Sequence, residues 1–402
     1  MSSRPGPSAI ELVPRPSGPG YRDEDLAARR SWVEERTGAR LKHVGASTIP
    51  AGELRGNIEN PVGAVQVPLG VAGPLKIDGE HARGTFYVPL ATTEGTLVRS
   101  FERGMVALTR AGGATVRLWS DQNRISPIFT FPDVPSAREL ARRLPELAPA
   151  ARAAAEATTG HGRLLDLVAH PAGRRVIVEM RFATGDASGM NLVARAAEAA
   201  CARLQEDSGA EGFLLFSGQE GEKRPAGSLL AGGKGKTAVA GVRLPRRVVR
   251  AVLGVTPEAL TGLWHETVVG HLHGGSLGYG GHLANGLTAL YLACGQDVAN
   301  VANSAVGVTD LELSSEGGLL ATVTLPSLVV GTVGGGTGLP TSRECLEMIG
   351  CAGAGHAPKL AEIVAATVLA GELSFGAAVA AGELVKAHET YGRNRPPKGN
   401  TP

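Results

Sequence analysis

Hydrophobic positions recur at two spacings along the chain, and these spacings predict strands that alternate with helices. Apolar residues alternate over 65–71 and run together over 86–90, which is typical of strands. A helix is expected to begin near Thr92 or Thr93, either of which can serve as its N-cap, and to end near Arg110. The early part of the chain therefore contributes strands and a helix to one core.

The pattern changes between 126 and 216, where six elements follow one another in the order β-α-β-β-α-β. They are expected over 127–131, 135–157, 163–168, 175–182, 190–204 and 212–216. This order is that of a ferredoxin-like arrangement. The stretch is long enough for a compact unit, so it predicts a small inserted domain.

Residues 282–303 are apolar on almost every face of a helical projection, which indicates a helix buried in the middle of a globular domain. His282, Asn285 and Asp297 are among the polar residues that interrupt it too often for a membrane span. A buried carboxylate needs a partner. Asp297 is therefore either a structural group that caps a turn or an acid that pairs with a cation at a functional site.

The remaining pattern completes an α+β protein. Further strands are expected over 236–242, 319–323 and 327–332, and further helices over 23–37, 245–254, 256–272, 341–350, 357–370 and 372–388. The predicted architecture is a large α/β domain around a central buried helix, with an inserted ferredoxin-like small domain. The expected parts are an N-terminal disordered and helical segment 1–57, a large domain 58–125 plus 227–380, a small domain 126–215, a linking loop 216–226 and a mobile tail 381–402.

Composition narrows the class of protein. The 402 residues are 43% hydrophobic and 19% charged, which is ordinary for a soluble enzyme. A net charge of +2 argues against a nucleic-acid or polybasic membrane surface. The four cysteines lack metal-ligand spacing, so no metal site is expected and they fit the reduced core of a cytoplasmic protein. The first thirty residues contain no apolar run, so no signal peptide or membrane anchor is expected.

Two glycine-rich motifs suggest nucleotide binding, but neither matches a standard fold. Gly235-Lys236-Thr237 is not a P-loop, because Leu230 stands where that motif needs a glycine. No strand-Gly-x-Gly-x-x-Gly-helix unit is present, so a nicotinamide would bind outside a Rossmann fold. The loop 185–191 follows a strand and opens a helix, where amide groups favour anions and Asp186 could bond ribose or amide groups. A plain N-cap is the alternative for this loop.

Three charged residues have both a structural and a chemical interpretation. Lys223 lies in a polar loop and is either part of a solvated cluster or the partner of an acid such as Asp297 or Glu94. Glu94 itself suits the first turn of a helix by charge alone. His388 ends the last long helix, where the helix dipole favours imidazolium, and an exposed terminal histidine is usually inert.

Taken together, the motifs resemble the 3-hydroxy-3-methylglutaryl-CoA (HMG-CoA) reductase family over about residues 55–394. They are Glu59-Asn60-Pro61-Val62-Gly63, Pro68 to Leu75, Ala91 to Gly95, Gly185 to Asn191, Glu222 to Pro225, His282 to Asn285, Ala293 to Asp297, Gly331 to Thr337, Ala370 to Ser374 and Leu384 to His388. Gly70-Val71-Ala72-Gly73-Pro74-Leu75 and the loop that contains Lys223 are similar to the eukaryotic and archaeal class of the family rather than to the other bacterial class.

The resemblance implies a four-electron reduction of HMG-CoA to mevalonate and CoA, as in isoprenoid precursor synthesis. It implies NADPH as the cofactor, with NADH as the alternative, bound by the small domain. It also implies a homodimer or homotetramer with the active site at the subunit interface. The membrane anchor of eukaryotic relatives is absent from this sequence, which favours a soluble cytoplasmic enzyme.

The resemblance also implies residue roles. Lys223 would stabilise the oxyanion, Asp297 would keep it charged, Glu94 would donate a proton, His388 would protonate the CoA thiolate, and Asn285 would orient Lys223 or the thioester oxygen. Ser100 and Arg103 would meet CoA phosphates, and the substrate carboxylate would be held by Arg124, Ser217 and Arg224. The cofactor would be held by Asp186, Ser188, Gly189, Met190, Asn191, Gly334, Gly335, Gly336 and Thr337.

Several residues depart from the family pattern near the acyl end. Glu266 stands where the family has a lysine that pairs with the substrate carboxylate, Arg224 replaces a second lysine, and the loop at Gln219 is one residue short. Asn394 replaces a serine that is regulated in some relatives, so no phosphorylation control is expected there. These departures motivate one alternative, a specialised paralogue that reduces a related acyl-CoA. A non-catalytic CoA-binding protein of this fold is a second alternative, which the presence of Glu94, Lys223, Asp297 and His388 disfavours.

Overall fold

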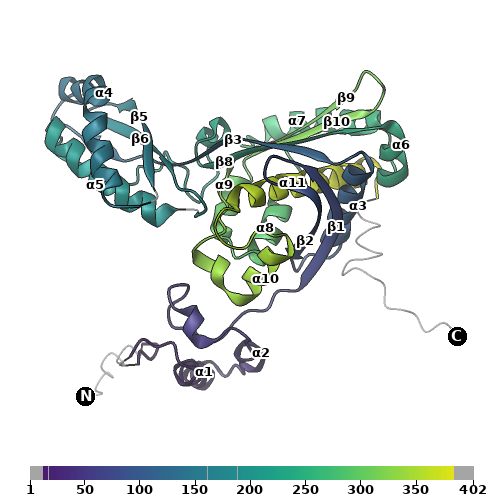
Figure 1. Ribbon diagram of the computed structural model, residues 1–402, viewed down its shortest axis with the longest axis horizontal. Coiled ribbons are helices and arrows are strands. Elements are labelled where there is room, and N and C mark those ends of the chain that lie inside the picture. Colours follow the sequence, from purple (N-terminus) through teal and green to yellow (C-terminus); the bar gives the residue numbers. More distant parts are fainter. Residues whose placement is uncertain (1–11, 17, 161, 188, 384–402) are drawn as a thin grey trace, which may run out of the picture.

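One long strand joins the two sheets of this protein in a computed structural model, which describes residues 12–383 except 17, 161 and 188. Strand β3 (Ala114–Ile125) pairs antiparallel with β8 (Gly235–Leu244) along most of its length. Its last residues pair instead with β6 (Arg175–Ala183). The strand order β7-β4-β6-β3-β8-β10-β9 follows from this sharing, and Figure 1 shows a smaller unit beside a larger one.

The smaller unit has the predicted ferredoxin-like order. Its elements are β4 (Ile128–Thr130), α4 (Val134–Glu156), β5 (Arg163–Ala172), β6, α5 (Met190–Ser208) and β7 (Gly212–Leu214). The strands are antiparallel in the order β7-β4-β6-β5, and α4 and α5 pack on one face around a separate hydrophobic core (Figure 1). Helix α4 begins where the Asp133 side chain accepts a hydrogen bond from the Ser136 backbone N–H at 2.8 Å. The predicted topology is confirmed.

The larger unit is built on a mixed sheet whose strands come from distant parts of the chain. To β3 and β8 it adds β1 (Leu69–Asp78), β2 (Arg83–Ala91), β9 (Val308–Leu313) and β10 (Leu319–Leu328). Its helices are α3 (Leu97–Arg110), α6 (Arg246–Val248), α7 (Pro257–His273), α8 (Leu283–Ala293), α9 (Val301–Ser304), α10 (Pro340–Met348) and α11 (Ala357–Ala380). Three 3-10 helices are η2 (Gly227–Ala231), η4 (Val298–Asn300) and η5 (Gly335–Gly338), and η3 (Val249–Leu253) is a short π-helix.

The central helix of the large core is α11. Every residue from Leu360 to Ser374 is buried, and α11 packs against α3, α8, β8 and β10 (Figure 1). Among the described residues α11 is the one helix long and apolar enough to cross a membrane, but 72% of its apolar window is buried inside the protein. That burial is typical of a core helix.

The predicted helix over 282–303 is wrong beyond residue 293. Helix α8 ends at Ala293, and Gly295 follows with a left-handed φ of 63°. A Cβ at Gly295 would also lie 2.3 Å from the carbonyl oxygen of Gly336. The chain therefore turns at Gly295, and only the short elements η4 and α9 follow.

The two helices expected over 357–370 and 372–388 are a single helix as far as Ala380. Gly371 does not end a helix. A Cβ there would lie 2.5 Å from the ring of Phe101, so the glycine allows α11 to approach α3 closely.

Strand prediction also failed in places. Strands β3 and β9 were not predicted, and the strands expected over 319–323 and 327–332 are replaced by β10. Helix α3 begins at Leu97 after Thr96, not at Thr92 or Thr93. These differences are largest where strands carry polar side chains, because such strands lack a clear alternation.

The N-terminal segment lies beside the larger unit (Figure 1) and contains α1 (Asp23–Thr37), α2 (Lys42–Gly45) and η1 (Ala51–Leu54). The buried Arg29 on α1 donates to the backbone carbonyls of Gly20 at 2.9 Å and Pro61 at 3.1 Å. Its third acceptor is the Pro14 carbonyl at 3.3 Å. Residues 14 and 20 fall in the stretch expected to be disordered, and one arginine fixes both.

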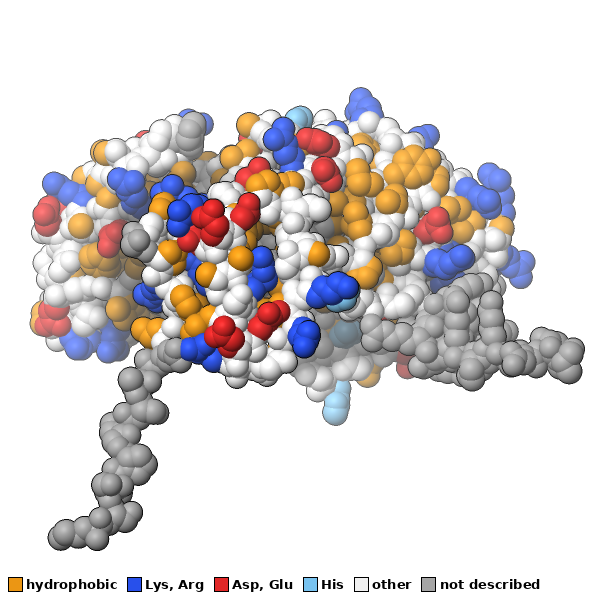
Figure 2. Space-filling model, turned by 90° about the horizontal axis from the view of Figure 1, so that it is seen from below, with side chains coloured by type: hydrophobic (Ala, Val, Ile, Leu, Met, Phe, Trp, Pro, Cys, Tyr) orange, Lys and Arg blue, Asp and Glu red, His pale blue; other side chains and the backbone are white. Residues whose placement is uncertain are grey.

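The four cysteines lie in both hydrophobic cores. All four cysteines are free and buried, Cys201 in the small core and Cys294, Cys345 and Cys351 in the large one. Acidic and basic side chains are interspersed over the face shown in Figure 2. That distribution accords with the small net charge of +2.

Candidate active site

The loop after β7 presents Lys223 in an unusual backbone conformation. Gly218, Gly221 and Lys223 have φ values of 94°, 67° and 53°, a region that disfavours residues with a Cβ. Lys223 Nζ lies 2.7 Å from Oδ2 of Asp297. The hydrogen bond to Asp297 raises the pKa of Lys223, so its ammonium is charged at neutral pH.

Asp297 is not buried, contrary to the prediction. Its side chain is 44% exposed, because the turn at Gly295 carries it out of the core. Oδ1 accepts a hydrogen bond from the Ala299 backbone N–H at 3.1 Å and caps η4, while Oδ2 faces Lys223. The capping and the cation-pairing interpretations both describe this carboxylate, one for each oxygen.

A pocket of about 320 Å³ lies beside Asp297, and the glycine loop 334–337 lines it. Gly334 and Gly335 have positive φ and open space where a Cβ would stand, so a ligand can approach the backbone closely. Gln296 accepts the Gly331 N–H at 2.8 Å and ties the start of this loop to the turn that carries Asp297. The residues predicted to hold a cofactor here, Gly334, Gly335, Gly336 and Thr337, all line the pocket.

Asp186, also predicted to hold the cofactor, connects three segments. Its carboxylate accepts the N–H groups of Gly355 at 2.7 Å and Ala357 at 3.0 Å, at the start of α11. Its backbone carbonyl accepts the Thr332 N–H at 2.8 Å. Burial acts to raise the pKa of Asp186, but the two hydrogen bonds outweigh it and the pKa is lowered. The ionised carboxylate therefore caps α11.

The other predicted cofactor residues of this loop begin α5. Gly189 precedes the helix with a φ of 75°, Asn191 is exposed on the first turn, and Ser188 lies outside the described residues. Met190 turns its sulfur inward, where Lys234 Nζ donates to it at 3.0 Å. Lys234 was not predicted.

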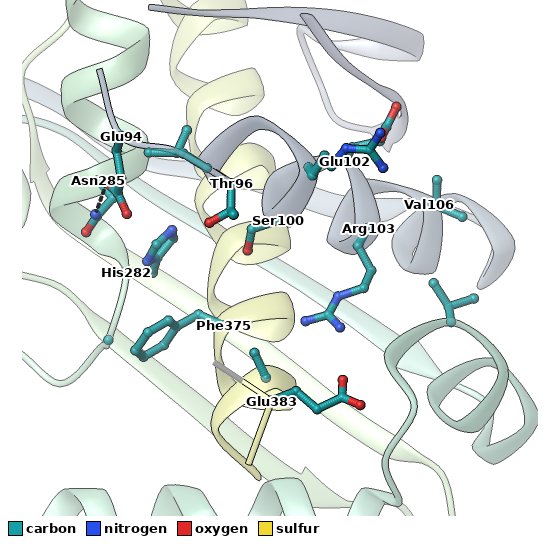
Figure 3. A pocket seen from close by; sticks show the side chains of 15 residues that line it. Glu94, Thr96, Ser100, Glu102, Arg103, Val106, His282, Asn285, Phe375 and Glu383 are labelled. Carbon is teal, nitrogen blue, oxygen red and sulfur yellow. Dashed lines mark hydrogen bonds between the residues drawn. The ribbon is translucent and has the colours of Figure 1, made fainter. Parts of the chain in front are cut away.

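A larger pocket of about 570 Å³ lies between α3 and α11 and contains the predicted acid (Figure 3). Asn285 Nδ2 donates to Glu94 Oε2 at 2.7 Å. Within this chain Glu94 is the partner of Asn285, and the role of Asn285 toward Lys223 or the thioester oxygen stays a prediction. Glu94 precedes α3 in a turn, so the helix-dipole explanation for this acid does not apply.

His282 lies at the same end of the pocket and was not among the predicted site residues (Figure 3). Its ring stacks on Phe375, with 5.1 Å between centroids, and lies 5.2 Å from the ring of Phe101. Burial lowers the pKa of His282, and Glu94 acts in the opposite direction. Its Nε2 has no hydrogen-bond partner among the described residues. The sequence signal is the helical spacing from Asn285.

Ser100 and Arg103, predicted to meet CoA phosphates, line this pocket from one face of α3. Ser374 on α11 positions both: Arg103 Nε donates to Ser374 Oγ at 2.9 Å, and Ser100 Oγ donates to the same oxygen at 3.1 Å. Burial lowers the pKa of Arg103, while Glu383 acts to raise it. A partly desolvated guanidinium in a pocket is suited to binding an anion.

The residues predicted to hold the substrate carboxylate differ in exposure. Arg124 is 4% exposed and donates to the Glu220 carbonyl at 3.4 Å and to Ser228 Oγ at 3.0 Å. Burial lowers the pKa of Arg124. Ser217 and Arg224 lie in the loop that Arg124 holds, and Arg224 is exposed.

The predicted catalytic residues form two separate groups within one chain. Lys223 pairs with Asp297, Glu94 pairs with Asn285, and the described part of the chain shows no contact between the two pairs. His388 and the tail beyond residue 383 lie outside the described residues. Within one chain the two pairs therefore stand apart.

One group of described residues has donor atoms close enough to hold a metal ion: Glu80, His81 and Glu362. The Glu362 oxygens already accept the backbone N–H groups of Glu80 at 3.0 Å, His81 at 2.9 Å and Ala82 at 2.5 Å. Those bonds fix the turn between β1 and β2, so we assign Glu362 a structural role.

Comparison with known proteins gives a consistent result. The model of the hydroxymethylglutaryl-coenzyme A reductase family matches residues 25–393. The chain is 43% identical over 382 residues to 3-hydroxy-3-methylglutaryl-coenzyme A reductase of Pyrococcus horikoshii, covering 92% of both chains. It is also 43% identical over 376 residues to the reductase of Methanothermobacter thermautotrophicus, covering 92% of this chain and 94% of the relative. Both relatives are archaeal.

Solved structures agree in fold. A Streptococcus pneumoniae 3-hydroxy-3-methylglutaryl-coenzyme A reductase has a TM-score of 0.67 and 18% identity, covering 88% of this chain and 96% of that one. The class II enzyme from the same organism, bound to NADPH in open conformations, has a TM-score of 0.67 and 20% identity, covering 89% and 85%. From the family match over most of its length and its 43% identity to curated relatives, the chain belongs to the hydroxymethylglutaryl-coenzyme A reductase family.

Proposed function

We propose that this protein reduces HMG-CoA to mevalonate, consuming two NADPH and two protons and releasing two NADP+ and one CoA. The observation that carries the proposal is the ion pair between Lys223 and Asp297, 2.7 Å apart, in a member of this family. The thioester carbon accepts one hydride, the carbon–sulfur bond breaks to give an aldehyde, and the aldehyde accepts the second hydride. Negative charge develops on the same oxygen in both reductions.

Lys223 is proposed to stabilise that charge. Its ammonium is exposed to the adjoining space, and Asp297 holds it in the protonated form. A preorganised donor at a developing oxyanion is commonly worth about 3–4 kcal/mol of transition-state stabilisation. The left-handed backbone of Lys223 fixes the direction of its side chain, which supports a positioning role for the loop.

Glu94 is proposed to donate a proton in the second reduction, with His282 beside it and Asn285 fixing its orientation. Because Glu94 and Lys223 lie in separate groups of one chain, we propose that a second subunit brings them together in a homodimer or homotetramer. Exposed apolar side chains at Leu69 and Val71, on β1, offer a surface for such a contact. His388 is proposed to protonate the CoA thiolate.

The 570 Å³ pocket is proposed to receive CoA. Ser100 and Arg103 face it from α3, and Arg103 supplies a fixed guanidinium for a phosphate. The free carboxylate of the substrate is proposed to meet Arg224, which is exposed next to Lys223. Arg124 and Ser217 would then support that loop, since Arg124 already donates to loop atoms.

The pocket beside Asp297 is proposed to receive the nicotinamide end of NADPH. Its glycine loop leaves space for close approach of a ligand to the backbone, and the Asp186 loop of the small unit bonds directly to Thr332 at its start. When bound, NADPH supplies the hydride. The small unit, residues 126–215, is proposed as the cofactor-binding domain of an enzyme that works in the cytoplasm.

The direct test is nicotinamide absorbance of purified protein with HMG-CoA and either NADPH or NADH, combined with detection of the CoA thiol. We expect loss of absorbance with NADPH and release of one thiol for every two cofactors oxidised. Folded protein that turns over neither cofactor with HMG-CoA would contradict the proposal. In that case related acyl-CoA thioesters are the next substrates to assay.

A further inference from the structure

Lys234 is a completely buried lysine directly before β8, and the reaction described above does not use it. Its side chain is 0% exposed. The flanking Gly233 and Gly235 have φ values of 88° and 82°, and a Cβ at Gly235 would lie 2.3 Å from the Leu328 carbonyl oxygen. The glycines therefore let the chain turn tightly enough to bury the lysine between them. An unpaired ammonium in such a place would be strongly destabilising.

The ammonium of Lys234 contacts three separate parts of the protein. It forms an ion pair with Oε2 of Glu222, the residue directly before Lys223. It donates to the sulfur of Met190, the first residue of α5, at 3.0 Å. It also donates to the Arg124 backbone carbonyl on β3 at 3.4 Å. One cation thus connects the loop that carries Lys223, the start of the helix after the Asp186 loop, and the strand shared by the two sheets.

These contacts are directional and few, so they can transmit a displacement. Met190 lies in the loop-to-helix junction of the small unit, and a shift of that junction moves the acceptor of a buried charge. Glu222 pairs directly with this charge and the buried Glu220 also acts on it, and both carboxylates belong to the Lys223 loop. Burial lowers the pKa of Lys234, and Glu222 acts to raise it, so the charged state depends on this partner.

We propose that Lys234 is a positioning residue that couples the cofactor loop 185–191 to the catalytic loop 217–224 through Glu222 and Met190. The proposal rests on the function proposed above for these two loops. Lys234 touches neither substrate nor cofactor in this role. It sets where Lys223 stands when the small unit has its cofactor bound.

The test compares the full-length protein with Lys234→Met, Glu222→Gln and the double variant. Methionine keeps the length of the side chain and removes the charge. We expect kcat with HMG-CoA to fall about 10- to 100-fold in Lys234→Met, the size of loss that displacement of a reacting group produces. We expect the kcat of the double variant to lie within about twofold of the kcat of Lys234→Met, because the ion pair is already broken in the single variant.

Glu362→Gln is the matched control for Glu222→Gln. Glu362 is 0% exposed, and its carboxylate accepts the backbone N–H groups of Glu80, His81 and Ala82 in the turn between β1 and β2, so the substitution removes a buried carboxylate charge whose partners lie outside both loops. We expect the kcat of Glu362→Gln to stay within about threefold of the original protein. An equal loss of kcat in Glu362→Gln and Glu222→Gln, or losses that multiply in the double variant, would overturn the proposal. If Lys234→Met does not fold, Glu222→Gln alone is expected to show the loss of kcat.

Hydrogen exchange separates this inference from the proposed function. Without any ligand, backbone exchange in 185–191 and in 217–224 is expected to be faster in Lys234→Met than in the original protein. With NADPH added, we expect protection of 185–191 to persist in the variant and protection of 217–224 to be lost. Protection of 217–224 by NADPH that is unchanged in the variant would overturn the coupling. A protein without HMG-CoA turnover whose two loops still loosen together would refute the function and leave the coupling standing.

Discussion

Asp297 shows how one side chain can satisfy two requirements. One oxygen caps η4 through the Ala299 N–H and the other pairs with Lys223. The cap fixes the carboxylate, and the fixed carboxylate holds the ammonium. Because 44% of the Asp297 side chain is exposed, the strength of the pair depends on geometry more than on low dielectric.

Substitution of Asp297 by Asn separates charge from capping. Asparagine is as good an N-cap as aspartate, so the turn is expected to survive. The pKa of Lys223 is raised by Asp297, so without the carboxylate that pKa falls and the lysine loses its proton at lower pH. We expect the alkaline limb of the kcat/KM profile to move to lower pH. An unmoved limb with normal thermal stability would show that Lys223 does not set it.

The sequence predicted the chemical type of the site residues better than their surroundings. Lys223 and Asp297 were expected to pair and do so at 2.7 Å. The exposure of Asp297 was missed, because it depends on a single glycine conformation at Gly295. His282 and Lys234 were missed because their burial follows from distant partners, Phe375 for the imidazole and Glu222 for the ammonium. The spacing from Asn285 could have pointed to His282, but the packing partner of either side chain is not visible in local spacing.

At the scale of elements, glycine has two opposite effects that sequence alone does not distinguish. Gly295 ends α8 with a positive φ, whereas Gly371 lies inside α11 and makes room for Phe101. Both stand in apolar stretches. The β-α-β-β-α-β order was predictable because alternation and helical spacing repeat cleanly there. Strand β3 was not predictable from this spacing, because its polar residues 121–124 pair first with β8 in the large sheet and then with β6 in the small one.

Gly295→Ala tests the close approach of two site loops. A non-glycine residue in the left-handed region costs about 1–3 kcal/mol, and the new Cβ would meet the Gly336 carbonyl at 2.3 Å. Gly254→Ala is the control, since Gly254 has a φ of 75° and open space around a Cβ. We expect chemical denaturation to show a larger loss of unfolding free energy for Gly295→Ala. Equal losses would show that backbone conformation alone is responsible.

Glu266→Lys restores, on α7, the lysine that the family pattern has at this position, and tests whether the glutamate affects turnover of HMG-CoA. Glu266 is exposed in the described chain, where solvent screens its charge. We therefore expect kcat/KM for HMG-CoA to change by less than about threefold. A gain of tenfold or more would place this residue against the substrate carboxylate, across a subunit interface, and would count against a paralogue adapted to another acyl group.

At the scale of the whole molecule, the two pockets described above present different side chains. The pocket of Glu94 and Arg103 holds an acid and an anion-binding group, and the pocket of Asp297 adjoins the glycine loop. A symmetric pair of chains would supply each pocket twice. The fold class of both units was predictable from the sequence pattern. An active site shared between subunits was expected only from the family resemblance, because the separation of these groups within one chain depends on tertiary placement.

Subunit mixing tests whether two chains complete one site. We expect Glu94→Gln and Lys223→Ala homo-oligomers to be nearly inactive when measured separately. The two variants are then dissociated, mixed in equal amounts and reassembled. About a quarter of the original activity should return, because half of the dimers contain one chain of each variant and each such dimer holds one intact site of two. Mixtures no more active than their components would show that Glu94 and Lys223 of the same chain work together.

The burial of all four cysteines has a practical consequence for measuring this chemistry. Burial raises the pKa of Cys351 to about 12 and raises those of Cys201 and Cys294 further, so these thiols carry almost no thiolate at neutral pH. Thiolate is the form that attacks an aromatic disulfide dye. In native buffer the protein should therefore give a flat baseline with such a dye. Every increment of colour would then count one molecule of coenzyme A leaving the enzyme.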